Sequence, residues 1–289
     1  MYDTTGPHPG TIKIQVGSSS WHMEPACCCC YKRPVSAQCA PPTAEPIHTN
    51  YLKIDAWESE LDDSFPYYDE VMTGIRDGFP LVNREVDSAP VERENYHSAT
   101  NPKVRDKVEA QIKVEVAEGR YQIVDYKPHI VSSIGAIEKS NDKVRIIHDA
   151  SQPSQGSLNS FAVLDEKTSF ESVQNAAAVL KKGYYMAKLD FKSAYRSVRI
   201  AKSHHTLAGL KWHFSDQEEP VYMVDTRLPF GSRLAPLHFH KISQAVKHIM
   251  QKRGSCDLVA YLDDFLLIAP TYQECMENLN NVLDNKSII

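Results

Sequence analysis

The 289-residue sequence has no apolar run long enough to cross a membrane as a helix, for which about 18 residues are the minimum. Its first residues, Met1-Tyr2-Asp3, lack the basic flank and the apolar stretch of a secretory signal. We therefore expect an intracellular protein, cytoplasmic or nuclear, that has no membrane partner.

The cysteines also do not favour a zinc site. The seven cysteines include the consecutive run Cys27–Cys30. Adjacent cysteines do not readily present four sulfurs to one tetrahedral ion, because a short loop has to wrap around the metal. The pattern favours reduced thiols in a cytosolic chain.

Positive charge is scarce overall, since 32 Lys and Arg face 37 Asp and Glu for a net charge of -5. Taken alone, this balance disfavours a partner rich in phosphates. The average hides a gradient, because residues 1–100 carry 7 basic and 15 acidic side chains, whereas residues 181–253 carry 14 basic and 5 acidic ones. We call residues 181–253 the basic segment and expect a nucleic acid partner there.

What the sequence does contain divides it into two parts. Residues 1–95 hold many prolines and the acidic run Trp57–Asp63, which predicts a poorly ordered acidic connector. From residue 96 to 289, helix and strand patterns are dense and mixed, which is typical of an α+β domain.

Several elements of the second part can be placed by their patterns. Apolar residues at every fourth position from Val104 to Val116 predict a helix over 102–119. Thr168-x-x-Glu171 resembles a capping box and predicts a helix that runs to about residue 182. Residues 184–191 predict a strand, and Pro236 opens a further helix.

An aspartate pair, Asp263 and Asp264, interrupts the apolar segment Leu258–Ala269. Buried carboxylates need partners, so we expect a hairpin whose turn carries the pair out of the core. Such a pair suits a divalent cation, and a plain solvent-exposed turn is the alternative. Asp190 ends the strand over 184–191, where it is either a strand-end cap or a third carboxylate beside the pair. Three carboxylates together would hold two Mg²⁺ ions for nucleotidyl transfer.

Four segments in this order resemble the conserved blocks of reverse transcriptases: Ile137–Asp149, Lys188–Arg196, Leu228–Pro236 and Tyr261–Asp264. The stretches VDTRLPFGSRLAP and VAYLDDFLLI look most like DIRS-type tyrosine-recombinase retrotransposons, and gypsy-like elements come next. The resemblance covers residues 95–289 and implies a right-hand fingers–palm fold.

The resemblance also implies roles for single residues. Asp190, Asp263 and Asp264 would be the catalytic carboxylates that hold two Mg²⁺ ions, with Mn²⁺ as an alternative. The backbone carbonyl of Phe191 would also face a metal. Tyr195 would be the aromatic steric gate that excludes a ribose 2′-hydroxyl, and a plain core position is the alternative for this ring.

Further residues would bind the nucleotide. Phe230 and Gly231 would lie against the incoming nucleotide and the template base, where a glycine lets the backbone approach a ligand closely. Arg145 would contact the triphosphate, because its planar fork matches phosphate oxygens. Its companion would be Lys143 or Lys139, and the choice between the two stays open.

The implied reaction is RNA-directed DNA synthesis, in which dNTPs are added to a primer on an RNA or DNA template. The basic segment would contact the backbone phosphates of that duplex. Few residues follow the last predicted helix, Thr271–Asp284, which predicts a fragment without the thumb. A catalytically inactive, truncated remnant that at most binds nucleic acid is one alternative. An RNA-dependent RNA polymerase is another, against which Tyr195 argues. The sequence predicts no oligomeric state.

Overall fold

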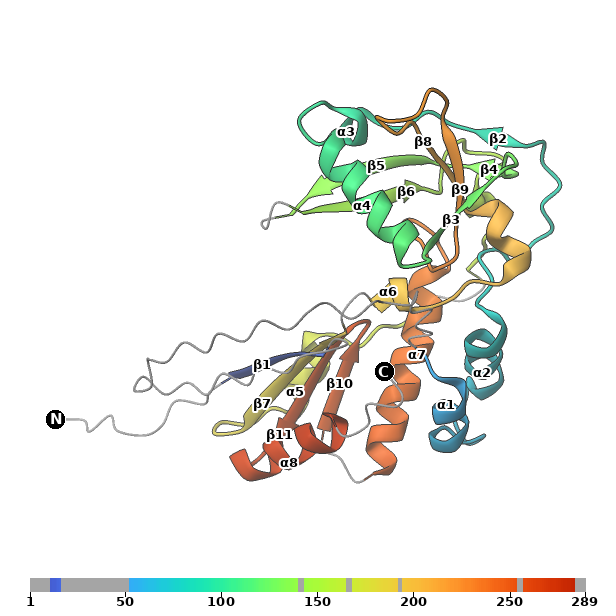
Figure 1. Ribbon diagram of the computed structural model, residues 1–289. Helices are drawn as coiled ribbons and strands as arrows, with labels where there is room; N and C mark the ends of the chain where they lie inside the picture. Colours follow the sequence, from blue (N-terminus) through green and yellow to red (C-terminus); the bar gives the residue numbers. More distant parts are fainter. Residues whose placement is uncertain are drawn as a thin grey trace, which may run out of the picture.

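The computed structural model describes residues 52–139, 143–164, 168–191, 194–253 and 257–283, together with the backbone of residues 11–16. Within these ranges the chain forms two lobes, one above the other in Figure 1. The expected mixture of helices and strands is confirmed. The run Cys27–Cys30 lies outside the described residues. None of the described helices combines the length and the apolarity that crossing a membrane requires.

The palm lobe, the lower one in Figure 1, is built on a four-stranded sheet. Its strands lie in the order β1 (Thr11–Val16), β7 (Tyr185–Phe191), β11 (Asp264–Ala269) and β10 (Asp257–Tyr261). Strand β7 is parallel to β1 and antiparallel to β11, which forms a hairpin with β10.

Three helices pack on the strands of this sheet. They are α5 (Val173–Val179), α7 (Ala235–Lys252) and α8 (Tyr272–Leu283). Helix α7 lies against β10, helix α8 against β11 and β7, and α5 against β10 and β11. The apolar face of α7, from Phe239 to Ile249, is buried in the same core as Leu189 and Phe265.

The fingers lobe, the upper one in Figure 1, contains a five-stranded sheet and a separate hairpin. The five strands lie in the order β2 (Val91–Glu92), β4 (Ile130–Val131), β8 (Gly209–Trp212), β9 (Val221–Asp225) and β3 (Tyr121–Val124). The hairpin pairs β5 (Ser133–Glu138) with β6 (Val144–Asp149).

The predicted helix over 102–119 lies in this lobe as α4 (Arg105–Ala117), after the short α3 (His97–Thr100). Val108 and Ile112 on α4 are fully buried in a core of the lobe's own. The remaining short helical turns are η1 (Leu158–Phe161), α6 (Ala194–Ser197) and η2 (Lys202–Leu207).

The expected acidic connector differs from the structure over residues 52–95. Helices α1 (Ile54–Glu60) and α2 (Tyr68–Asp77) form there, and α2 packs on α7. Trp57, in the middle of the acidic run, is 0% exposed and belongs to the palm core. Acidic residues dominate the composition of this run, but one buried tryptophan is enough to fix a helix on the core.

The expected capping box also differs from the structure. Helix α5 begins only at Val173 and is capped by Ser172 and Asn175. Glu171 instead accepts a hydrogen bond of 2.6 Å from the backbone N–H of Ala260. Because β10 is an edge strand, its outward N–H groups need a partner, and the Glu171 carboxylate supplies one.

Candidate active site

The three predicted aspartates meet at one end of the palm sheet. Asp190 lies near the end of β7 and is the register partner of Asp264, the first residue of β11. Asp263 lies in the turn of the β10–β11 hairpin, as the sequence predicts, whereas Asp264, expected in the same turn, already belongs to β11. Sequence positions about 70 residues apart are therefore joined by strand pairing.

Two contacts fix the hairpin turn. The backbone N–H of Phe191 donates to the carbonyl of Asp263 (3.1 Å). The hydroxyl of Ser243, on α7 and 0% exposed, lies 2.5 Å from the carbonyl of Leu262, which it can donate to. Leu262 has a φ of 52°, a conformation that a branched residue adopts only when its surroundings hold it. Sequence reasoning missed Ser243, because a serine in the apolar stripe of a helix carries no motif.

The carboxylates crowd one another electrostatically. Burial, the charges of Asp263 and Asp264, and a hydrogen bond with Asp264 raise the pKa of Asp190, against an opposing effect of Lys188. Burial and the charge of Asp264 also raise the pKa of Asp263. Lys188 Nζ lies 2.7 Å from Asp264 Oδ1, so this cation compensates part of the repulsion.

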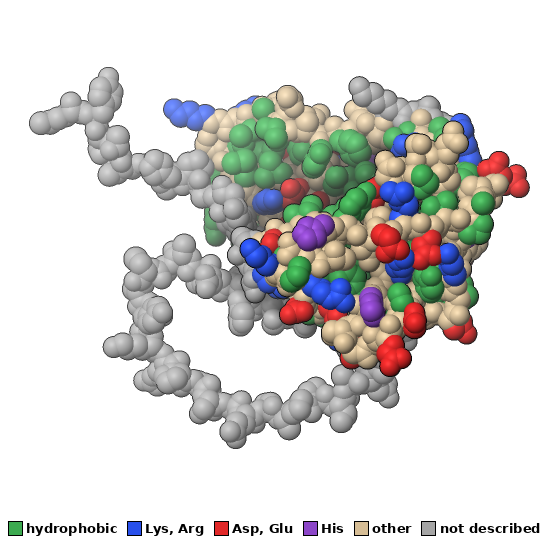
Figure 2. All heavy atoms as spheres, turned by 90° about the horizontal axis from the view of Figure 1, so that it is seen from above, with side chains coloured by type: hydrophobic (Ala, Val, Ile, Leu, Met, Phe, Trp, Pro, Cys, Tyr) green, Lys and Arg blue, Asp and Glu red, His purple; other side chains and the backbone are tan. Residues whose placement is uncertain are grey.

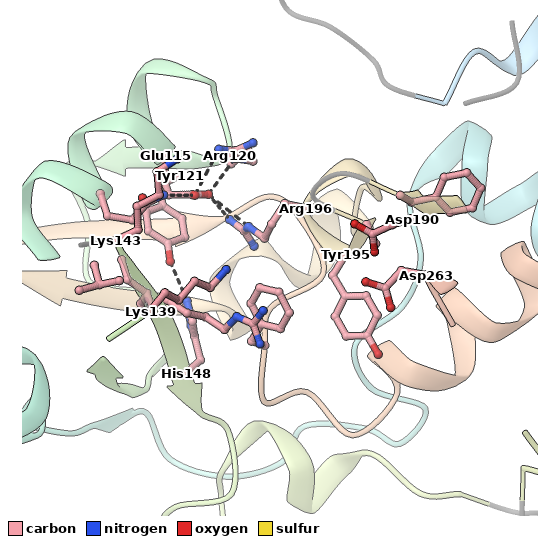
Figure 3. A pocket seen from close by; sticks show the side chains of 17 residues that line it. Glu115, Arg120, Tyr121, Lys139, Lys143, His148, Asp190, Tyr195, Arg196 and Asp263 are labelled. Carbon is pink, nitrogen blue, oxygen red and sulfur yellow. Dashed lines mark hydrogen bonds and ion pairs between the residues drawn. The ribbon is translucent and has the colours of Figure 1, made fainter. Parts of the chain in front are cut away.

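A pocket of about 760 Å³ lies between the two lobes and brings most of the predicted site residues together (Figure 3). Asp190 and Asp263 line its palm side. The other predicted residues that line it are Lys139, Lys143, Arg145, Phe191, Tyr195 and Phe230. Asp264 and Gly231 do not line this pocket. Carboxylates on one side thus face a cluster of cations on the other.

A stack of three side chains crosses the pocket. The ring of Tyr195 lies on that of Phe230, with centroids 5.4 Å apart and planes at 24°. The guanidinium of Arg145 lies over the Phe230 ring, 5.1 Å from its centroid. Burial and the charge of Asp263 raise the pKa of Tyr195 to about 12, so its hydroxyl is neutral at physiological pH.

Both lysines left open by the sequence line the pocket. Lys139 and Lys143 are joined by a backbone hydrogen bond from Lys139 N–H to the Lys143 carbonyl (2.7 Å) at the tip of the β5–β6 hairpin. Partial burial and the charges of Arg145 and Lys143 lower the pKa of Lys139. Three cations held this close favour an anion with several charges, such as a triphosphate.

Gly231 has a role that the sequence did not predict. Its φ is 121°, and a Cβ at this position would overlap the backbone carbonyl of His148. The glycine therefore permits two segments of the backbone, around residues 148 and 231, to lie close together. The hydrogen bond from His148 N–H to the Phe230 carbonyl (2.9 Å) joins the same segments. The approach of Gly231 to a ligand stays a prediction.

The pocket also holds a set of buried ionic residues that sequence reasoning did not assign to the site. They are Glu115, Arg120, Tyr121, His148 and Arg196. Figure 3 shows Glu115 between the two arginines and Tyr121 pointing to His148. Glu115 lies next to the predicted apolar stripe of α4, and no local pattern separates a buried glutamate from an exposed one.

The carboxylates fit a divalent cation only in part. Asp190 and Asp263 offer oxygen ligands that face the pocket, which is the donor type Mg²⁺ prefers, and burial together with the charges of neighbouring aspartates raises the pKa of both. Among the described residues, no group of three or more His, Cys, Asp and Glu is arranged to hold a metal ion. Asp264 is paired with Lys188 instead.

Much of the basic segment pairs with acidic side chains of the same chain. Besides Lys188 and Arg196, five of its basic residues form such pairs: Lys211 with Glu92 and Glu94, Lys241 with Glu70, Lys247 with Glu171, Lys252 with Asp62, and Arg253 with Glu60. Most of these carboxylates come from residues 52–95. In the view from above, Figure 2 shows Lys and Arg side chains next to Asp and Glu. These five residues thus have carboxylate partners within the chain, and their contact with nucleic acid stays a prediction.

The two lobes, with paired carboxylates on one and clustered cations on the other, have the architecture of a right-hand polymerase. Residues 137–287, more than half of the chain, match the family described as "Reverse transcriptase (RNA-dependent DNA polymerase)". The chain therefore belongs to the reverse transcriptase family.

Relatives and solved structures agree with this assignment. The Gag-Pol polyproteins of Woolly monkey sarcoma virus and Gibbon ape leukemia virus are each 26% identical over 100 residues, which are 34% of this chain and 6% of the polyprotein. A foamy viral protease–reverse transcriptase in complex with dsDNA has a TM-score of 0.57 and 19% identity, covering 72% of this chain and 39% of that chain. The native Prototype Foamy Virus protease–reverse transcriptase has a TM-score of 0.55 and 18% identity, covering 72% and 25%. These structures share the fold.

Proposed function

We propose that this chain catalyses the template-directed addition of deoxynucleotides to a primer 3′-hydroxyl, as the RNA-directed DNA polymerase of a retroelement. The observation that carries the proposal is the pocket between the lobes. There Asp190 and Asp263 face Lys139, Lys143 and Arg145, so that one surface suits divalent cations and the opposite one a triphosphate.

In this proposal Asp190 and Asp263 hold the Mg²⁺ ions, for which Mn²⁺ is an alternative, and Asp264 is the further carboxylate beside Asp190. Bound metal lowers the pKa of the attacking hydroxyl and neutralises the leaving pyrophosphate. Arg145 and the two hairpin lysines bind and orient the triphosphate. The primer oxygen then attacks the α-phosphorus, and the bond to pyrophosphate breaks.

Tyr195 is proposed as the steric gate. Its ring lies in the pocket and is fixed between Phe230 and the tilted ring of Phe239, whose centroid is 5.3 Å away. A ring held on two sides cannot swing away from a ribose 2′-hydroxyl without losing both contacts. This arrangement supports selection of deoxynucleotides over ribonucleotides.

The retroelement is proposed to be of the DIRS type, with gypsy-like elements next, on the basis of the segments VDTRLPFGSRLAP and VAYLDDFLLI. The proposed partners are dNTPs and an RNA or DNA template with its primer. The intracellular location, cytoplasmic or nuclear, stays a prediction.

Primer extension on a homopolymer RNA template with Mg²⁺ or Mn²⁺ tests the proposal. Asp263→Asn should lower extension by at least about 100-fold, because metal binding contributes several kcal/mol to such a transition state. Asp257→Asn, on the exposed part of the same hairpin, is the matched control and should extend primers like the wild type. Extension that persists in Asp263→Asn would show that the site is assigned wrongly.

Two other results would change the function itself. A folded protein that binds duplex in a salt-dependent manner but extends no primer is the inactive alternative. Incorporation of ribonucleotides in preference to deoxynucleotides would indicate an RNA polymerase.

A further inference from the structure

Arg196 follows the proposed gate residue directly in sequence, and its side chain is only 10% exposed. Its Nε and Nη2 donate to Glu115 Oε2 at 3.2 and 2.9 Å. Its Nη1 donates to Asp225 Oδ2 at 2.7 Å and to the carbonyl of Leu228 at 3.3 Å. One guanidinium thus joins α6 to the fingers helix α4, to the end of β9 and to the loop before α7.

These contacts leave Arg196 little capacity to bind a phosphate. A guanidinium has five N–H groups, and four of them are accounted for by these bonds. Asp225 is 0% exposed, and Glu115 also binds Arg120. Removing the arginine would take the guanidinium from the buried Asp225 and leave Glu115 with Arg120 alone, so Arg196 is held in place.

The element that carries Arg196 needs such an anchor. Helix α6 is a single turn of four residues, Ala194–Ser197, and a helix this short is not stable by itself. Local hydrogen bonds of this turn include those from Val198 N–H to the Tyr195 carbonyl (3.2 Å) and from Ser197 Oγ to the Ala194 carbonyl (2.6 Å). The four bonds of Arg196 are therefore a main restraint on this turn.

The same turn sets the position of the Tyr195 ring. Phe230 and Phe239 contact the ring, while Arg196 ties the adjacent backbone to Glu115 on the fingers helix α4. Figure 3 shows the two side chains leaving α6 in different directions, Arg196 toward Glu115 and Tyr195 toward the aspartates. Movement of the turn would displace the ring against the nucleotide.

We propose that Arg196 is a positioning residue for nucleotide selection, which acts by tying the turn that carries Tyr195 to Glu115 and Asp225. The inference rests on the proposed function, in which Tyr195 separates deoxynucleotides from ribonucleotides. Arg196 itself contacts neither the nucleotide nor the primer. This role differs from the phosphate contact that its place in the basic segment suggests.

Two variants of the full chain test the proposal. Arg196→Lys keeps the positive charge but cannot reach both carboxylates with a planar fork. Glu115→Gln keeps the side-chain volume and the Arg196–Asp225 bond, and so provides a folded variant if Arg196→Lys does not fold. Arg233→Lys is the matched control, because Arg233 donates to the carbonyl of Ala162 (2.9 Å) and does not line the pocket.

The first measurement is independent of activity. Hydrogen exchange of the Val198 amide, which closes the α6 turn, should accelerate at least about tenfold in Arg196→Lys and less in Glu115→Gln, because the turn opens more often. The amides of α8 and the Val198 amide of Arg233→Lys should exchange as in the wild type. Unchanged exchange at Val198 in a folded Arg196→Lys or Glu115→Gln protein overturns the proposal.

The second measurement is the ratio of kcat/KM for a dNTP to that for the matching rNTP. It should fall at least about tenfold in Arg196→Lys, since small misplacements of a positioning group cost one to two orders of magnitude, and stay within twofold in Arg233→Lys. A fall in duplex affinity with a reduced salt dependence, at an unchanged ratio, would make Arg196 a phosphate ligand and overturn the proposal. If even the wild type extends no primer, the proposed function fails, and the exchange measurement still decides the role of Arg196.

Discussion

Replacement of Gly231 by alanine should destabilise the fold far more than its chemistry suggests. Gly231 has a φ of 121°, and its added Cβ would overlap the carbonyl oxygen of His148. Gly183 provides a matched control, since its φ is 90° but nothing lies within 4 Å of an added Cβ. Both variants place an alanine in an unfavourable backbone conformation. Only in Gly231→Ala does the added Cβ also overlap another segment of backbone.

The difference can be estimated from the contacts. The left-handed conformation costs an alanine about 1–2 kcal/mol, which is the whole expected effect of Gly183→Ala. In Gly231→Ala the backbones must also separate, which breaks the bonds from His148 N–H to the Phe230 carbonyl and from Asn159 Nδ2 to the Gly231 carbonyl (both 2.9 Å). Each lost bond costs about 1 kcal/mol, so the total should be at least about 3–4 kcal/mol.

Urea unfolding of the two variants and the wild type, followed by circular dichroism, measures these free energies. The slope of the free energy against urea should be the same in all three proteins, because the surface exposed on unfolding does not change. A Gly231→Ala protein within 1 kcal/mol of Gly183→Ala would refute the close backbone passage. If the Gly231→Ala protein is stable but has a raised KM for dNTPs, the result would support the sequence prediction that Gly231 approaches a ligand closely.

Three further predictions concern other parts of the molecule. Trp57→Ala should lower the free energy of unfolding by about 3–5 kcal/mol, as is usual for a fully buried tryptophan, and equilibrium unfolding measures it. Ser243→Ala should lower primer extension about tenfold at unchanged duplex affinity, because the hairpin that carries Asp263 loses its bond to α7. Hydrogen bonds from Lys127 and Lys211 lower the pKa of Glu92 from 4.5 to about 2, so its stabilising effect is complete above pH 4.5 and is lost as the pH falls toward 2. The unfolding free energy of the wild type should therefore fall more steeply than that of Glu92→Gln between pH 5 and pH 3, which acid titration of stability checks.

The sequence predicted correctly those features that depend on residues close together in the chain. The hairpin around Asp263 follows from a charged pair between two apolar flanks, and its turn lies where expected. Helix α4 follows from its four-residue apolar spacing. The proximity of Asp190 to Asp263 and Asp264 could be predicted only from the resemblance to reverse transcriptases. Pairing between strands so far apart in the chain leaves no local sequence pattern.

The errors arose where a side chain's partner is distant in sequence. Glu171 has the spacing of a helix cap but serves the edge of β10. Trp57 stands in an acidic run but is fully buried in the palm core. Arg196 counts as a surface cation by composition, yet its partners Glu115 and Asp225 come from two other elements. Each of these outcomes depends on tertiary contacts that neither propensity nor local charge encodes.

The pairing of acidic residues 52–95 with the basic segment bears on how ionic strength would affect a bound duplex. Affinity for B-DNA falls with salt because each lysine or arginine that neutralises a phosphate displaces a counterion, which adds about 0.9 to the slope of log K against log salt. Lys211, Lys241, Lys247, Lys252 and Arg253 already have carboxylate partners and contribute no such displacement while those pairs persist. A duplex held under the proposed function would thus show a salt slope shallower by about 4–5 than the basic count of residues 181–253 implies.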